Sequence, residues 1–110
     1  MNSLEQLTLF EPQSRYKPGD FVKPEDIGRQ LNFDELSPGA LVILDVSTQS
    51  HKWYQLHRVE KIIWNQYENC RRLILYHGKP QRSYINKRWF RDPGDGERGV
   101  RMYELREGNP

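Results

Sequence analysis

The chain has 110 residues, 35% hydrophobic and 29% charged, which is enough for one packed domain but short for two. Its single cysteine excludes an internal disulfide bond and a four-cysteine zinc site, and favours a cytoplasmic protein. The longest apolar run, 40–44, is far shorter than the roughly 20 residues of a membrane-spanning helix, and no signal-like stretch opens the sequence. Neither secretion nor a membrane partner is therefore expected.

Residues 1–19 are predicted to form a flexible tail, because a few apolar side chains are followed by breaks at Pro12 and Pro18. The segment 20–23 can form a short first strand. The segment 32–36 has the cap residue and early acidic residues of a single helical turn. We expect the packed domain to span 20–105, with its core in 36–105, and residues 106–110 to form a C-terminal tail.

Five strands are predicted, at 40–46, 52–64, 71–76, 82–89 and 100–105. In the second strand, the apolar residues switch from even to odd positions near His57. This switch predicts a bulge that bends the strand. The third and fourth form a hairpin whose loop contains Gly78. Short antiparallel strands without a long helix indicate an all-β fold, and Trp53, Trp64 and Trp89 are expected to fill its core.

The order of these elements resembles that of SH3-like barrels. Leu36, Pro38, Gly39, Leu41 and Val42 open the pattern, and a bent aromatic strand and a hairpin follow. The resemblance covers roughly residues 36–105. It implies a small antiparallel barrel of about five strands, preceded by the flexible tail.

The sharpest motif lies in that tail. The pentapeptide at 6–10 reads Gln-Leu-Thr-Leu-Phe and resembles the peptide, usually written Gln-Leu-Ser/Asp-Leu-Phe, by which bacterial replication and repair proteins bind the DNA polymerase III β sliding clamp. The resemblance implies that Gln6 hydrogen-bonds in a polar subsite, that Leu7 packs at the rim, and that Leu9 and Phe10 fill an apolar pocket. Adjacent bulky side chains on a flexible peptide are typical anchors in any case.

The same apolar residues have a second interpretation. Leu4, Leu7 and Phe10 can form a short segment that docks on the chain's own domain. The sequence leaves open whether the tail is free or packed.

Charge and aromatic residues are divided unevenly along the chain. Residues 1–50 hold four basic and eight acidic residues, whereas 51–91 hold ten basic and two acidic residues together with eight of the thirteen aromatic ones. Cations interleaved with rings suit phosphates and bases, although strands with solvated outer faces show the same pattern. The candidate nucleic-acid contacts lie in the hairpin and are Arg71, Arg72, Arg82, Tyr84, Lys87 and Arg88.

Part of this set follows the two-residue repeat of a β-strand. If Ile85 and Trp89 face the core, the opposite face of the last hairpin strand carries one row of Arg82, Tyr84, Asn86 and Arg88. Such a row can hold phosphates and stack a base. In the alternative, Tyr84 packs under a neighbouring strand and the arginines are solvated.

Catalytic and metal-binding residues are not expected. The four potential metal ligands have spacings that match no common ligand pair, and they are His51, His57, Cys70 and His77. No glycine-rich phosphate loop or serine nucleophile motif is present in the sequence. We therefore expect a protein that is not an enzyme and needs no cofactor.

These observations favour an accessory factor of bacterial DNA replication or repair, with the sliding clamp and single-stranded DNA or RNA as partners. The alternative is a protein-interaction barrel or an assembly subunit whose basic face meets an acidic protein. A third class is a small hydrolase or regulator that depends on its histidines. The oligomeric state is left open.

Overall fold

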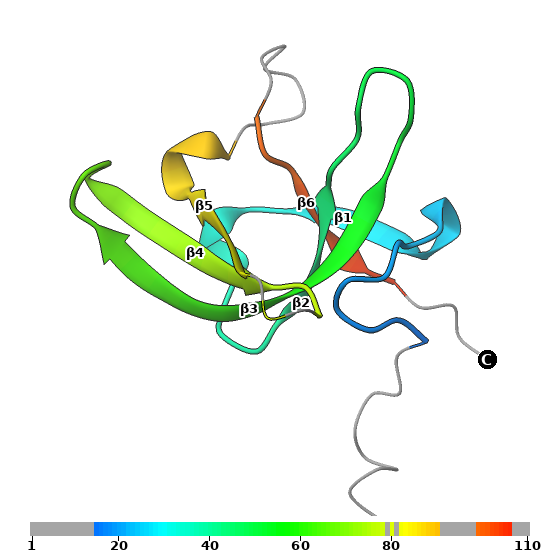
Figure 1. Ribbon diagram of the computed structural model, residues 1–110, viewed down its shortest axis with the longest axis horizontal. Helices are drawn as coiled ribbons and strands as arrows, with labels where there is room; N and C mark the ends of the chain where they lie inside the picture. Colours follow the sequence, from blue (N-terminus) through cyan, green and yellow to red (C-terminus); the bar gives the residue numbers. More distant parts are fainter. Residues whose placement is uncertain (1–14, 79, 81, 91–98, 107–110) are drawn as a thin grey trace, which may run out of the picture.

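The computed structural model describes residues 15–78, 80, 82–90 and 99–106, which form a six-stranded antiparallel sheet (Figure 1). The strands are β1 (Ile27–Leu31), β2 (Leu41–Asp45), β3 (Tyr54–Asn65), β4 (Cys70–Tyr76), β5 (Arg82–Asn86) and β6 (Met102–Leu105), in the spatial order β1-β6-β2-β3-β4-β5. Short 3-10 helices are η1 (Pro24–Asp26), η2 (Phe33–Glu35) and η3 (Lys87–Trp89). The predicted all-β fold is confirmed. Within the described ranges, no helix is long and apolar enough to cross a membrane.

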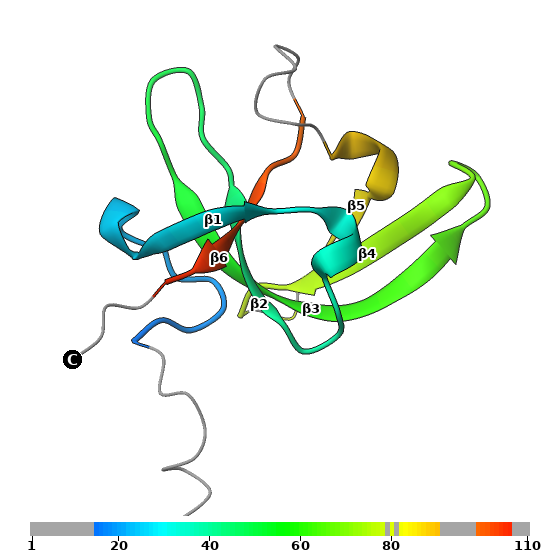
Figure 2. The same ribbon diagram turned by 180° about the vertical axis from the view of Figure 1, so that it is seen from behind.

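The long strand β3 joins the two halves of the sheet. It pairs with β2 up to Arg58 and with β4 from Arg58 onward, and its curved path is visible in Figures 1 and 2. Its register with β4 shifts between Val59 and Lys61. The bulge that the sequence predicts near His57 therefore lies slightly further along the strand, where the extra residue bends it.

A segment before η1 lies beside the first part of β3, in the position that β4 occupies beside the later part of the same strand. The backbone N–H of Gly19 donates to Leu56 O at 2.7 Å, and the N–H of Leu56 donates to Asp20 O at 2.9 Å. Gly19 has φ +102°, and a Cβ there would lie 2.3 Å from His77 O, so only glycine fits this close approach. Packing thus begins before residue 20, whereas residues 1–14 and 107–110 of the predicted tails lie outside the described residues.

The sheet does not close into the expected SH3-like barrel, so that part of the sequence prediction is wrong. β1 pairs with β6 and β5 pairs with β4, and these two strands are the edges of the described sheet. The chain leaves the ladder at Asn86 and turns into η3, after which an isolated bridge joins Phe90 to Val100. The sixth strand, β1, was not predicted.

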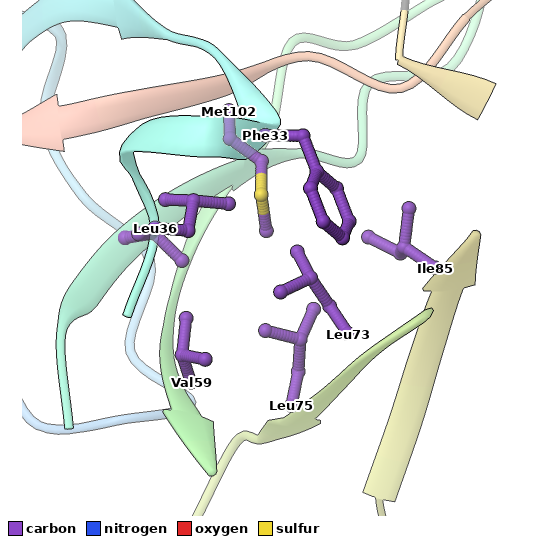
Figure 3. Close-up of a cluster of buried hydrophobic side chains, with 8 residues drawn as sticks. Phe33, Leu36, Val59, Leu73, Leu75, Ile85 and Met102 are labelled. Atoms are coloured by element: carbon purple, nitrogen blue, oxygen red, sulfur yellow. The ribbon is translucent and has the colours of Figure 1, made fainter. Parts of the chain in front are cut away.

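Two apolar clusters pack on opposite faces of the sheet. The larger cluster, seen in Figure 3, consists of Phe33, Leu36, Val42, Val59, Leu73, Leu75, Ile85 and Met102. The smaller cluster consists of Val22, Ile43 and Leu56. Val42 and Ile43 are consecutive in β2, so their side chains point to opposite faces.

The three tryptophans are not core residues, contrary to the sequence prediction. Trp53, Trp64 and Trp89 are 43%, 61% and 38% exposed. Trp53 precedes β3, Trp64 lies near the end of β3, and Trp89 belongs to η3. The core is instead formed mainly by aliphatic side chains on the central parts of the strands.

Candidate nucleic-acid interface

The candidate interface is the outer face, defined as the face of β3, β4 and β5 opposite the larger cluster. On β4 it carries Arg72, Ile74 and Tyr76, because these residues alternate with the buried Leu73 and Leu75. The register of the sheet adds the partners of these residues, which are Arg58, Lys61 and Ile63 on β3 and Arg82, Tyr84 and Asn86 on β5. Sequence positions up to 28 residues apart therefore meet on one surface.

Guanidinium groups stack on tyrosine rings across this face. Arg58 and Arg82 each place their Cζ atom 4.7 Å from the centre of the Tyr76 ring. Arg72 lies 4.1 Å from the centre of the Tyr84 ring. Cation–π contacts of this kind hold both partners in place while the cations stay accessible to a ligand. Trp89 extends the row, with its ring centre 5.8 Å from that of Tyr84.

Several of the candidate cations are paired with carboxylates, which reduces the local positive charge. Arg82 Nε lies 2.7 Å from Glu60 Oε2. Arg88 Nη1 lies 2.8 Å from Glu68 Oε2. The formal excess of eight basic residues in 51–91 thus overstates the field that a phosphate would meet at this surface.

Arg71 and Lys87 lie away from the outer face. Both donate to Oδ1 of Asp34, and both approach the ring of Phe33 in η2, at 5.2 and 5.8 Å. Hydrogen bonds from Lys87 and from Arg71 lower the pKa of Asp34. Arg71 shares its parity with the buried Leu73, so the sequence already contained the signal that separates it from Arg72.

The predicted row along the last hairpin strand is only partly correct. Arg82 and Tyr84 lie on the outer face as expected, and Tyr84 is 51% exposed. The strand ends at Asn86, which is buried, and Arg88 belongs to η3. The expectation that Trp89 faces the core fails for the same reason, since the period of two does not continue into a 3-10 helix.

Asn86 holds Arg72 in position. Its Oδ1 accepts a hydrogen bond from Arg72 Nε at 2.9 Å and another from Asn65 Nδ2 at 3.2 Å. Both asparagines are buried, so this oxygen is fixed by the fold. Sequence reasoning missed Asn65 and also the stacking partners Arg58 and Tyr76, because their placement depends on strand register and on the bulge in β3.

The buried histidine lies beside a second histidine and a glutamine. His57 is buried, its ring centre lies 5.3 Å from that of His77, and its Nε2 lies 3.0 Å from Gln55 Oε1. Burial, and to a lesser extent the neighbouring His77, lower the pKa of His57 to about 4. The described part of the chain contains no group of three His, Cys, Asp or Glu side chains that could hold a metal ion.

The four candidate clamp contacts, Gln6, Leu7, Leu9 and Phe10, lie outside the described residues. Comparison of the chain with protein-family models, with curated proteins and with solved structures finds no match.

Proposed function

We propose that this chain is a non-enzymatic accessory factor of bacterial DNA replication or repair. Gln6, Leu7, Leu9 and Phe10 dock it on the DNA polymerase III β sliding clamp, and the outer face contacts single-stranded DNA or RNA weakly. The clamp contact is supported by the pentapeptide match alone. The observation that carries the nucleic-acid contact is the alternation of guanidinium groups and tyrosine rings across β3, β4 and β5.

The charges of the outer face support weak binding with little sequence preference. Neither Arg58 nor Arg72 has a carboxylate partner among the described residues, whereas Arg82 has Glu60. Two such cations can neutralise about two phosphates, and the exposed ring of Tyr84 offers a stacking surface that accepts any base. The face is a sheet surface without a recognition helix, which favours a single strand over a duplex.

Titration of a labelled single-stranded oligonucleotide at low salt tests the nucleic-acid contact. Tyr84→Leu should lower the affinity by roughly 1 to 3 kcal/mol, because it removes a stacking surface. Phe21→Leu is the matched control, since Phe21 is also an exposed aromatic residue but lies in the segment before η1. Absence of binding by the wild-type chain, or equal losses in both variants, would contradict a role of the outer face.

Binding to purified clamp tests the other half of the proposal. The double variant Leu9→Ala, Phe10→Ala should lose detectable binding, because truncation of buried anchors commonly costs about 2 kcal/mol or more each. Leu4→Ala is the control, since it changes an apolar residue of the same segment outside the motif. If the wild-type chain does not bind the clamp at tens of micromolar, the docking proposal fails.

An exposed aromatic group favours a second candidate function, a protein-interaction domain with no nucleic-acid role. Phe21 and Trp53 lie with ring centres 5.2 Å apart, and His51 stacks on Trp53 at 5.8 Å. Exposed aromatic groups of this kind are frequent anchors at protein interfaces. In this case Phe21→Leu would weaken binding to a protein partner, and Tyr84→Leu would not.

A further inference from the structure

We infer that Arg72, together with the hollow beside it at the turn between β3 and β4, binds a phosphate group of the single strand. This inference rests on the proposed contact between the outer face and nucleic acid, and it names the group that anchors the strand. The hollow has a volume of about 260 Å³ and is lined by Ile63, Trp64, Asn65, Gln66, Tyr67 and Arg72.

Arg72 is the member of the candidate set whose charge is least satisfied. In the described structure, Arg71, Arg82, Lys87 and Arg88 each have a carboxylate within 3.2 Å, and Arg72 has none. Of its five N–H donors, the one on Nε is used by Asn86. The terminal nitrogens of a half-buried guanidinium group are then available for an anion.

The geometry of Arg72 is fixed before any ligand arrives. Its Nε is bound to an oxygen that the buried Asn65 also holds, and its plane is supported by the Tyr84 ring at 4.1 Å. A guanidinium group fixed in this way loses little entropy when two of its N–H groups bind two phosphate oxygens. This rigidity distinguishes a built anion site from a solvated surface arginine.

The surroundings of Arg72 suit a nucleotide rather than an isolated ion. Tyr67, which is 90% exposed, lies at the hollow and offers a ring for the base next to the bound phosphate. The hollow is smaller than the usual pocket for a whole small molecule, which is about 300 Å³ or more, so it suits one group of a longer ligand.

The test compares Arg72→Lys with Arg71→Lys in oligonucleotide titrations. Arg72→Lys keeps the charge but removes the planar donor pair, so the affinity should fall about tenfold or more while the salt dependence stays the same. Arg71→Lys is the matched control, because Arg71 lies on the other face and is paired with Asp34; its affinity should stay within about twofold of wild type. Oligonucleotides with and without a 5′-phosphate distinguish a terminal from an internal phosphate.

The outcomes separate this inference from the proposed function. If the wild-type chain binds and the two variants behave alike, the role of Arg72 is refuted and the outer face remains a nucleic-acid surface. If the wild-type chain does not bind, both proposals fail.

A second measurement uses the unchanged protein. The NMR signal of the Trp64 indole N–H should shift on addition of the oligonucleotide, and that of the Trp53 indole N–H should not. A shift of the Trp53 signal alone would also overturn the inference.

Discussion

One face of the sheet carries two different surfaces. Ile43 and Leu56 are fully buried there, packed with Val22 in the smaller cluster. Two residues further along β3, on the same face, Arg58 is exposed and begins the outer face. The chain segment that contains Gly19 pairs with β3 beside Leu56, where β4 is absent, and so covers one half of the face and leaves the other half open.

The difference shows that alternation alone does not decide which residues form a core. The alternation of side chains along a strand determines which of them share a face. Whether that face is apolar or open to solvent depends on whether another segment covers it. On the open half, tyrosine rings are covered in part by arginines instead of by aliphatic side chains, and Tyr84 stays 51% exposed. Aromatic residues can therefore be frequent in a strand pair without belonging to the core.

The largest expected effect comes from truncation of an apolar side chain on each half. Leu56→Ala should lower the free energy of unfolding by about 2 to 5 kcal/mol, because it leaves a cavity in a fully buried cluster. Ile63→Ala, on the open half, should cost about 1 kcal/mol or less, since Ile63 is partly exposed already. Urea unfolding curves measure both, and similar losses would contradict the division of the face.

An intermediate effect is expected from His57, which lies where the covering segment meets the sheet. Gln55 Nε2 donates to Gly19 O, so Gln55 Oε1 accepts from His57 Nε2–H, and the buried Nδ1 has no hydrogen-bond partner among the described residues. Protonation would add a buried N–H without an acceptor. Burial, and to a lesser extent the neighbouring His77, hold the folded-state pKa of His57 at about 4, below the ordinary value of 6.5.

This lowered pKa makes stability depend on pH in a defined window. The unfolded chain binds the proton first, so the contribution of His57 is complete above about pH 6.5 and is lost as the pH falls towards 4, by about 3 kcal/mol in all. His57→Gln should flatten the unfolding free energy between pH 6.5 and 4.5. His51→Gln, which changes an exposed histidine, should leave the slope as it is in the wild-type chain.

The smallest expected effect concerns a single charge on the open half. Arg58→Gln should reduce the slope of log affinity against log salt for a single strand by about 0.7, because one phosphate contact is lost. The free energy of unfolding should change by less than about 0.5 kcal/mol, as for most surface substitutions. Lys52→Gln, an exposed cation before β3, is the control and should not alter the slope. A slope that changes only with Lys52 would place the nucleic-acid contact elsewhere.

The sequence predicts most of the sheet because its strands have local signals. The runs at 40–46 and 71–76 coincide closely with β2 and β4, since β-branched and alternating residues are bounded there by turn residues. β1 has no such signal, because Gly28 and polar residues interrupt its pattern and its pairing with β6 is a long-range contact. Barrel closure could not be predicted for the same reason, since it depends on how distant edges meet.

The candidate site could be predicted as far as it depends on the alternation of residues between the two faces of a strand. Parity places Arg82 and Tyr84 on one face, and the same rule applied to Leu73 separates Arg71 from Arg72. The partners Asp34, Glu60 and Glu68 could not be inferred, because ion pairs between distant residues leave no local pattern. The fixed position of Arg72 depends on the same kind of long-range contact.

The packing of Tyr16 fixes the point at which the N-terminal peptide joins the sheet. Tyr16 packs against the smaller cluster, and its hydroxyl donates to the buried carboxylate of Asp26. Phe10 precedes it by six residues, and a chain advances at most about 3.6 Å per residue, so their Cα atoms are never more than about 22 Å apart. If a partner holds Phe10, this short connection keeps the sheet near that partner, and a single strand bound to the same partner would meet the outer face at an effective concentration in the millimolar range. At that concentration, an intrinsic affinity in the millimolar range is enough to keep a single strand bound about half of the time.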